Sequence, residues 1–403
     1  MLNLTIALVT LTSIFLVVYH HAGYPLVLRY LRGRKARVQT DPAKTVAVDI
    51  DRGQLPSITI VVPAYNEADF IADKIRNLAI LDYPRDRLKV VIACDGSTDN
   101  THEIAIETAT EPECRDLSIT VIRFEQNRGK IALLNHLVGQ VDSEIVALSD
   151  VSALVSMDAL LLAAARFSDP EIGVVNGHYR LLSPGSEGEK KYWEYQSKVK
   201  AGEASLGSVI GSHGAFYLIR RKLFEQLPGD TINDDFIIPM RIVLRGYRSV
   251  YDGDIMALEL EHADSGLDAG RRHRIAAGNL QQLLRLKSLL LPRYRGTAFT
   301  FASGKCLRVL MPYLMILALA GSLLLAPHSP IFLLLGLGQA LGYLFYLLLE
   351  AFDLGDSKPL LQTFKYLLRG HFNSLKGSAS YLKSAIKAQF TRDSSALTTD
   401  QLS

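Results

Sequence analysis

The chain has 403 residues, more than one ordinary domain needs, so two or three structural units are expected. Hydrophobic residues make up 48% of the sequence and charged residues only 21%, which is an apolar balance for a globular protein. The net charge of +3 is small and no basic face is visible in the middle of the chain, so nucleic acid is not an expected partner. The three cysteines, Cys94, Cys114 and Cys306, lack metal-site spacing and even pairing, which indicates a reducing compartment.

The first expected element is a membrane span over residues Leu2 to Tyr19, an uncharged run close to the ~20 residues that cross a bilayer core. A secretory signal peptide is the weaker alternative, because no basic segment precedes the run and no small-residue cleavage site follows it. A basic cluster follows instead, made up of Arg29, Arg32, Arg34, Lys35 and Arg37. Such clusters remain on the cytoplasmic side. We expect a transmembrane helix at 1–28 and a basic cytoplasmic linker at 29–56.

Two further uncharged apolar runs, Val309 to Ala326 and Ile331 to Leu349, predict a transmembrane hairpin at 307–350. Residues 276–306 and the tail 351–403 mix apolar residues with Lys and Arg, which suits helices lying along an anionic membrane surface. Packing of the tail on the soluble domain is an equal alternative, and its charges disfavour another span. The positive-inside rule places the tail in the cytoplasm. We therefore expect a multi-pass protein of the inner (cytoplasmic) membrane, with membrane lipids as partners.

Between the spans, short apolar runs alternate with helix-like segments, the pattern of a parallel sheet covered on both faces. The runs are Ile58 to Val62, Leu88 to Ala93, Ile119 to Phe124 and Ile145 to Leu148. The helix-like segments are Glu67 to Ala79, Thr98 to Thr108 and Lys130 to Val138. The expected fold is α/β with a mostly parallel sheet, over residues 57–275.

In open α/β sheets the ligand lies beyond the carboxyl ends of the strands, so the polar residues that follow each apolar run are candidate site residues. Neither G-x-G-x-x-G nor G-x-x-x-x-G-K-[ST] occurs at these turns, which argues against a dinucleotide fold and a P-loop. The turns instead carry V-V-P-A-Y-N-E at 61–67, D-G-S-T-D-N-T at 95–101, N-R-G-K at 127–130, S-D-V-S at 149–152 and D-D-F at 234–236.

These motifs, in this order, resemble the family 2 glycosyltransferases with a GT-A fold, and in particular their bacterial, membrane-bound, polysaccharide-synthesising members. The resemblance runs from about Ser57 to Leu284 and extends to the flanking spans. It implies a nucleotide-diphosphate sugar as donor, most often a UDP-sugar, and transfer with inversion. It also implies a glycan or a lipid-linked sugar as acceptor.

The resemblance assigns nucleotide-sugar binding to Pro63, Tyr65, Glu67, Asp95, Lys130, Arg271 and Arg274. Each has an ordinary structural alternative. Asp95 also suits a turn, since Asp-Gly invites one, and Lys130 also suits a solvated helix start. Near a helix N-terminus, however, an ammonium can reach a diphosphate. Arg271 and Arg274 match a Q-x-x-R-W region in which Arg271 replaces Gln and Ile275 replaces Trp, and a lipid-headgroup patch is their alternative.

Asp150 matches the first Asp of a D-x-D motif that holds Mg²⁺ or Mn²⁺ in the family, but Ser152 stands where the second carboxylate belongs. Asp235 matches the catalytic base. Its neighbour Asp234 raises its proton affinity, which favours a base, although acids also suit a helix start. His213 and Gly214 lie in the segment that lines the acceptor site in the family.

The sequence therefore predicts a metal-assisted membrane glycosyltransferase acting at the cytoplasmic face. The alternative is a catalytically silent, nucleotide-binding subunit of a polysaccharide synthesis or export complex. The absent carboxylate at 152 and the absent Trp at 275 favour that alternative, whereas the presence of Asp150, Asp235 and Lys130 favours an enzyme.

Overall fold

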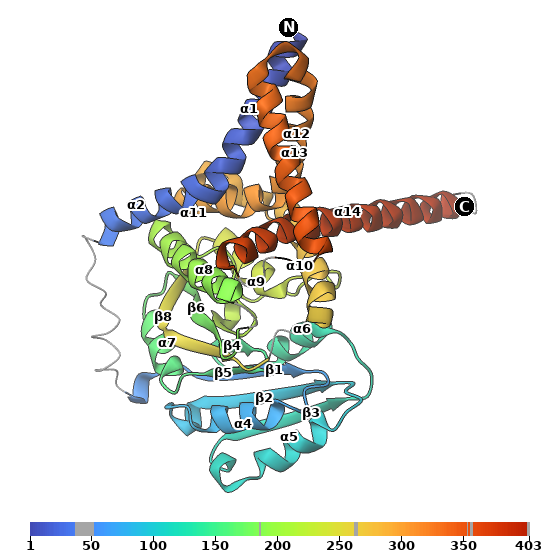
Figure 1. The fold of residues 1–403 in the computed structure, drawn as a ribbon. Coiled ribbons are helices and arrows are strands. Elements are labelled where there is room, and N and C mark those ends of the chain that lie inside the picture. The colour runs from blue at the N-terminus through green and yellow to red at the C-terminus, as the bar shows by residue number, and fades with distance from the viewer. Residues whose placement is uncertain (37–51, 185–186, 262–264, 353, 355–357, 401–403) are drawn as a thin grey trace. The chain divides into compact units, whose positions relative to one another are not determined.

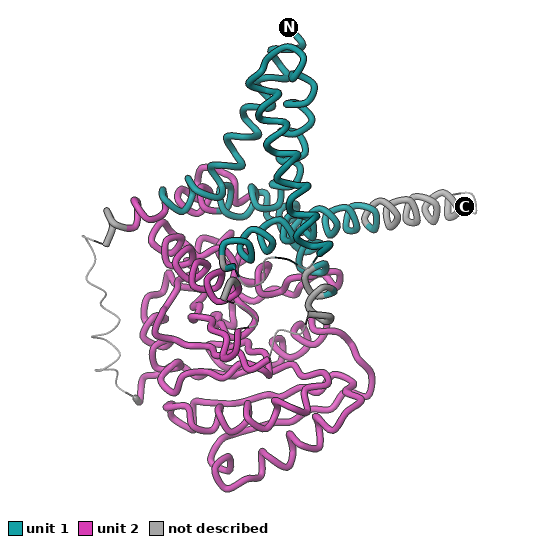
Figure 2. The backbone as a smooth tube through the Cα atoms, viewed as in Figure 1, with its two compact units in different colours: residues 1–27, 264–287, 301–403 teal, residues 28–263, 288–300 magenta. Residues whose placement is uncertain are grey.

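The computed structural model describes residues 1–36, 52–184, 187–261, 265–352, 354 and 358–400. The chain divides into two compact units, shown in separate colours in Figure 2. Unit 1 comprises residues 1–27, 264–287 and 301–403, and unit 2 comprises residues 28–263 and 288–300. Each unit is described by itself.

Unit 2 is built on one eight-stranded mixed sheet of order β3-β2-β1-β4-β7-β6-β8-β5 (Figure 1). Strands β3, β2, β1 and β4 run parallel, whereas β7 lies antiparallel between β4 and β6. The bounds are β1 Ile58–Ala64, β2 Leu88–Asp95, β3 Ser118–Phe124, β4 Ile145–Ser149, β5 Ala153–Val155, β6 Ile172–Leu181, β7 Phe216–Arg220 and β8 Arg248–Glu259. The predicted α/β fold with a mostly parallel sheet is confirmed.

The helices of unit 2 are α4 Ile71–Ala79, α5 Thr101–Ala109, α6 Lys130–Gln140, α7 Ala159–Phe167, α8 Glu187–Leu206, α9 Asp234–Leu244 and α11 Gly296–Thr300. Among them, α4, α5 and α6 match the three predicted helix-like segments, and the other helices were not among those segments. Short 3₁₀ turns are η2 Arg52–Gln54, η3 Arg85–Arg87, η4 Pro112–Cys114, η5 Arg221–Leu223 and η7 Pro292–Tyr294, while α2 Tyr24–Ala36 and η6 Lys287–Leu290 cross the boundary between the units.

The main core lies on one face of the sheet, where α4, α5 and α7 pack against alternate strand residues such as Ile60, Val90 and Leu218. Successive residues of a strand point to opposite faces, so Val61, Ala93 and Tyr217 belong to the other face. Helix α6 contacts β1 and β2, and α9 contacts β6 and β8. Burial on both faces explains why these strands read as continuous apolar runs.

The strand order creates a switch point between β1 and β4. From β1 the chain proceeds outward to β2 and β3, and then returns to place β4 on the other side of β1. The carboxyl ends of β1, β2 and β4 lie at the same edge, since Ala64 pairs in register with Cys94 and Val61 with Leu148. Ligands of open α/β sheets bind at such a point.

Unit 1 is helical. Its elements are α1 Leu2–Val18, η1 Tyr19–Gly23, α10 Ser265–Arg285, η8 Phe301–Cys306, α12 Leu307–Leu325, η9 Ala326–His328, α13 Pro330–Ala351 and α14 Pro359–Asp400. Helices α1 and α12 lie close together at Gly321, where an added Cβ would be 1.9 Å from the Thr10 hydroxyl oxygen. Small residues permit such close helix crossings in membranes.

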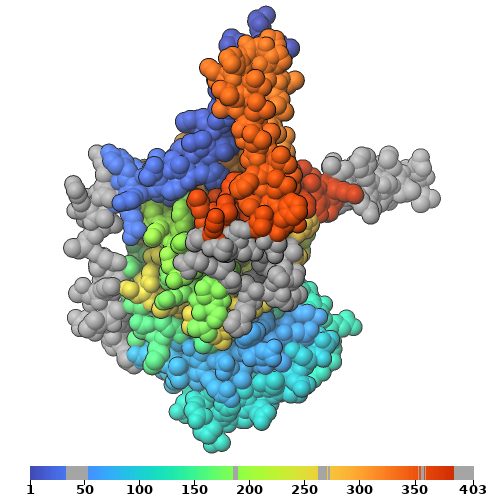
Figure 3. Space-filling view, in the orientation of Figure 1, coloured from blue at the N-terminus to red at the C-terminus, as the bar shows by residue number. Residues whose placement is uncertain are grey.

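Three helical segments of the described chain are long and apolar enough to cross a membrane: Leu2–Arg32, Gly296–His328 and Pro330–Ala351. Large apolar side chains such as Leu8, Leu334 and Leu341 are exposed on them, and α12 and α13 form the orange surface in Figure 3. The first helix continues through a π-helical turn to Ala36, further than the predicted span at 1–28. The predicted hairpin at 307–350 coincides with α12 and α13. The tail forms α14, which packs on α10, α12 and α13.

Candidate active site

The loops that follow β1 and β2 are tied together by side-chain to backbone hydrogen bonds. The Asn66 amide donates to Ser97 Oγ over 3.2 Å, and the Thr98 amide donates to Asn66 Oδ1 over 2.8 Å. Asp99 Oδ2 accepts from the Ala68 amide over 3.2 Å. The Asn66 backbone has a φ of 55°, in the left-handed region, which Asn adopts more readily than most other residues that carry a side chain. Asp99 therefore supports the two loops, as a turn residue does.

Asp95 holds the loop that precedes α6. Its side chain is buried, with Oδ1 accepting from the Arg128 amide over 3.0 Å and Oδ2 from the Gly129 amide over 2.9 Å. Each carboxylate oxygen keeps a second lone pair. The structure thus gives Asp95 a structural role in fixing the start of α6, and its role in nucleotide-sugar binding stays a prediction.

Lys130 is the first residue of α6 and lies between two carboxylates. Its Nζ is 2.9 Å from Asp150 Oδ1 and 3.5 Å from Asp234 Oδ2. Burial alone would lower the pKa of Lys130, but Asp150 and Asp234 raise the pKa above its usual value, so the ammonium remains charged. The Lys130 and Asp150 side chains are 38% and 31% exposed, so a ligand can reach them.

Asp234 and Asp235 occupy the first turn of α9, after Asn233. Asp234 is buried and Asp235 is half-buried. The Asp235 carbonyl accepts from the Ser212 amide over 2.9 Å, which joins the start of α9 to the loop before β7. The structure thereby brings the predicted catalytic pair beside Lys130 and Asp150, and the acids also lie where a helix N-terminus favours them.

The predicted acceptor residues lie against Asp150. A Cβ added at Gly214 would be 2.8 Å from Asp150 Oδ2, so no larger residue fits there without a shift. The Asp150 amide donates to the Ala215 carbonyl over 3.3 Å, and His213 Nδ1 accepts from the Ala215 amide over 3.2 Å. The loop before β7 therefore forms one wall beside the candidate metal ligand.

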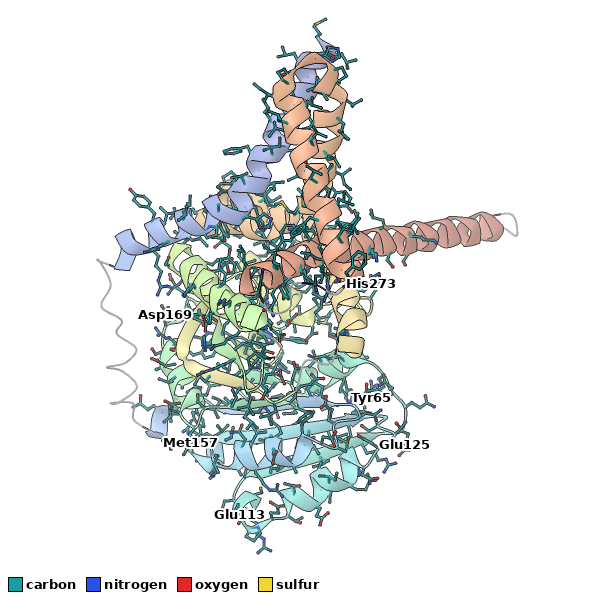
Figure 4. The ribbon with its side chains drawn as sticks, viewed as in Figure 1. Tyr65, Glu113, Glu125, Met157, Asp169 and His273 are labelled. Carbon is teal, nitrogen blue, oxygen red and sulfur yellow. The ribbon has the colours of Figure 1, made fainter. Side chains whose placement is uncertain are left out.

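Among the predicted residues of the first loop, Glu67 lies in an acidic environment. Burial raises the pKa of Glu67 to about 7, and the neighbouring carboxylates of Glu261, Asp150, Glu259 and Asp99 contribute. Pro63 is half-buried within β1. Tyr65 is 49% exposed, at the end of the sheet where these loops gather (Figure 4).

The residues present fit a divalent cation held by one protein carboxylate together with substrate oxygens. Mg²⁺ is commonly bound by one or two carboxylates plus substrate phosphates. Asp150 supplies such a ligand, whereas Ser152 hydrogen bonds to Glu259. No group of three or more His, Cys, Asp or Glu side chains within the described residues is arranged to hold a metal. A cation here would depend on the donor substrate for its remaining ligands.

Three residues that sequence reasoning missed lie around Asp150. Lys74 of α4 is fully buried, and its Nζ donates to Ser149 Oγ over 2.6 Å and to the Ala153 carbonyl, so it spans the segment that carries Asp150. Burial lowers the pKa of Lys74 to about 7. Its position in the apolar stripe of α4 was the available signal.

Tyr217 of β7 and Glu259 of β8 complete this set. The Tyr217 hydroxyl is buried and has no hydrogen-bond partner within the described residues. Burial, together with Asp234, Asp235 and Asp150, raises the pKa of Tyr217 well above its usual value, so the hydroxyl stays protonated. For Glu259, burial raises the pKa of the carboxyl group. No local sequence pattern marks Tyr217 or Glu259, since each lies within a strand that is far from Asp150 in the sequence.

Arg271 and Arg274 lie on α10, which belongs to unit 1, whereas the other predicted site residues belong to unit 2. Arg274 is exposed, as is Ile275 at the position of the family's Trp. The side chain of Arg271 lies outside the described part of the structure. A role for these arginines at the donor diphosphate stays a prediction.

The mixed sheet of unit 2, with the carboxylate of Asp150 directly after β4 at the switch point, is the arrangement expected of a GT-A fold. Residues 59–228 match the sequence model of the family described as Glycosyl transferase family 2. The matched segment contains the motifs at 61–67, 95–101, 127–130 and 149–152, so the match supports the resemblance that these motifs carry.

Two proteins of known activity are similar to part of this chain. The chain is 29% identical over 245 residues to a poly-beta-1,6-N-acetyl-D-glucosamine synthase of Staphylococcus aureus, which covers 59% of this chain and 58% of the relative. It is 29% identical over 270 residues to a beta-monoglucosyldiacylglycerol synthase of Nostoc, and this match covers 62% of this chain and 54% of the relative. The chain thus spans little more than half the length of these relatives.

Among solved structures, a mannosyltransferase from Pyrobaculum calidifontis in complex with GDP-Man and Mn²⁺ is similar in fold. The TM-score is 0.70 at 23% identity, and the match covers 93% of this chain and 99% of that chain. The likeness supports the GT-A fold.

Proposed function

We propose that the chain is a membrane glycosyltransferase that transfers a sugar from a nucleotide-diphosphate donor, with inversion, to a carbohydrate or lipid-linked acceptor. The observation that carries the proposal is the position of Lys130, whose ammonium lies between Asp150 and Asp234 at the switch point of the sheet. The proposal draws further support from the family match of residues 59–228.

The proposed roles follow from charge and position. The Lys130 ammonium exchanges its contact with Asp150 for the donor diphosphate and stabilises the negative charge that develops on the leaving group. A Mg²⁺ or Mn²⁺ ion at Asp150 would supply further positive charge to the same group. Asp235, half-buried at the start of α9, accepts the proton of the acceptor hydroxyl as that oxygen attacks the anomeric carbon. Asp234 keeps Lys130 oriented throughout.

The donor class rests on the relatives and on the fold. A UDP-sugar is proposed, because the similar synthase of Staphylococcus aureus makes an N-acetylglucosamine polymer and a UDP-sugar is the donor that the sequence motifs imply. The cation is proposed on the chemistry of Asp150. The three candidate spans support a multi-pass membrane location, and the basic residues after the first span support a cytoplasmic site.

The test is nucleotide release from a panel of UDP- and GDP-sugars by the full chain in lipid, with and without Mn²⁺ or Mg²⁺. Asp150→Ala and Asp235→Asn are compared with the wild type, and Asp142→Ala, an exposed acid on the loop before β4, is the matched control. We expect metal-dependent turnover of one donor that both site variants lose and the control keeps. Nucleotide binding without turnover, even with membrane extract as acceptor source, would instead indicate the catalytically silent subunit.

A further inference from the structure

Three aromatic rings from separate elements of unit 2 form a cluster: Tyr179 of β6, Trp193 of α8 and His213 of the loop before β7. The Tyr179 and His213 rings stack, with centroids 3.7 Å apart and planes 21° apart. Trp193 meets Tyr179 at 4.5 Å and His213 at 5.2 Å between centroids. Because each ring contacts the other two, the cluster is a rigid surface whose orientation is fixed by strand, helix and loop together.

This aromatic cluster lies next to the site. His213 is followed by Gly214, where a Cβ would be 2.8 Å from Asp150 Oδ2. His213 Nδ1 accepts from the Ala215 amide, and the Ala215 carbonyl accepts from the Asp150 amide. A ligand resting on the rings would therefore reach the carboxylate at which the donor diphosphate is proposed to bind.

The three residues also remain partly exposed. Tyr179, Trp193 and His213 are all half-buried, whereas aromatic residues that serve only the core of this unit, such as Phe216, are fully buried. A rigid aromatic surface that remains partly exposed beside the candidate site suits a ligand with a flat apolar face and a polar edge. A pyranose ring has that shape, with axial C–H groups on its face and hydroxyls at its rim. The hydroxyl end of a diacylglycerol or of a prenyl chain does not.

We infer that Tyr179, Trp193 and His213 form a stacking platform for a pyranose ring of the acceptor, so that the acceptor is the end of a carbohydrate chain. The inference rests on the proposed transferase function and narrows its acceptor.

Trp193 is the single tryptophan of the chain, so its fluorescence reports on the platform directly. The full chain in lipid is titrated with oligomers of β-linked N-acetylglucosamine and of β-linked glucose, and in parallel with diacylglycerol in mixed micelles. We expect a saturable change in emission with at least one oligosaccharide series and none with diacylglycerol. The inference would be overturned if only diacylglycerol changed the emission. It would also be overturned if the oligosaccharides that serve as acceptors left the emission unchanged.

Kinetics with the responding oligosaccharide give the second readout. Trp193→Leu is expected to raise the KM for the acceptor at least ~5-fold, while donor affinity and acceptor-independent donor hydrolysis stay within about twofold of wild type. Trp193→Phe keeps an aromatic face and is expected to retain most of the acceptor affinity. The matched control is Tyr195→Leu, since Tyr195 lies two positions along α8 and so about 200° around the helix from Trp193.

The two proposals fail separately. Emission changes on oligosaccharide binding in a chain that turns over no nucleotide sugar would contradict the transferase function, and would leave the cluster as a carbohydrate-binding surface that holds no acceptor. Transfer to an oligosaccharide with an unchanged acceptor KM in Trp193→Leu would support the transferase and overturn the platform.

Discussion

Lys130 and Asp150, twenty residues apart in the sequence, form an ion pair in which Nζ lies 2.9 Å from Oδ1. The pair joins the start of α6 to the end of β4 across the switch point of the sheet. In this state Lys130, which is proposed to contact the donor diphosphate, and Asp150, which is proposed to bind the metal ion, neutralise each other. The proposed mechanism therefore requires that donor binding rearranges this pair.

Lys130→Met removes the positive charge that we assign to the leaving diphosphate. We expect kcat/KM for the donor to fall by about 100-fold or more, as loss of a preorganised charge contact does in other sites. Nucleotide release against donor concentration measures it. Lys89→Met, at an exposed position of β2, is the matched control. Donor turnover within about threefold of wild type would remove Lys130 from the mechanism.

Asp95→Asn replaces one of two acceptor oxygens by an amide NH₂ that faces a backbone N–H. Because Asp95 is buried and accepts from Arg128 and Gly129, we expect a loss of stability of about 1–3 kcal/mol and a lower Tm. Thermal unfolding of the purified chain in detergent measures the change. Asp116→Asn, at an exposed loop position, should leave Tm unchanged. Equal melting of both variants would show that Asp95 does not hold the loop.

Glu67→Gln tests the acidic environment around Asp150 through pH. The pKa of Glu67 is about 7 in the folded chain against an ordinary 4.5. Below pH 4.5 the carboxyl is protonated in both states, so it does not affect stability. Between pH 4.5 and 7 the folded state binds more protons than the unfolded state, so stability falls as pH rises, and above pH 7 the penalty is complete.

Glu67→Gln should therefore stabilise the chain at pH 8, by about 1–3 kcal/mol after allowance for solvent screening, and have little effect near pH 4.5. Thermal unfolding at both pH values measures this. Glu125→Gln, whose side chain is 85% exposed, is the control (Figure 4). A shift in Tm of the same size at both pH values would point to altered packing and not to charge.

Gly96→Ala tests the turn after β2. Gly96 has a φ of +68°, and a Cβ there would lie 2.3 Å from the Asn127 amide nitrogen, in backbone that cannot move aside cheaply. We expect a loss of more than about 2 kcal/mol together with weaker donor binding, because the displaced loop carries Lys130. Gly229→Ala, with no atom within 4 Å of the added Cβ, should change stability by less than about 0.5 kcal/mol. Unfolding curves of the two variants decide the matter, and similar curves would refute the predicted strain.

Much of the fold could be predicted from the sequence. The apolar runs became β1 to β4 and the intervening segments became α4, α5 and α6, because strands buried on both faces and helices between turn residues leave local patterns. The two later apolar helices, α12 and α13, were also located, since about 20 uncharged apolar residues leave few alternatives to a long helix. The antiparallel insertion of β7 and the pairing of β5 with β8 left no such pattern.

The candidate site divides in the same way. The sequence by itself determined which loops carry Asp95, Lys130 and Asp150, because polar residues after buried strands lie at the carboxyl edge of the sheet. Asp235 was predicted only from the resemblance of the D-D-F motif. Only the tertiary structure decided that Lys130 pairs with Asp150 and Asp234, that Lys74 is buried beneath the Asp150 loop, and that Trp193 meets Tyr179 and His213. These contacts join residues far apart in the chain. Their formation depends on strand order and on helix packing, which follow from burial of the whole core and not from any local pattern.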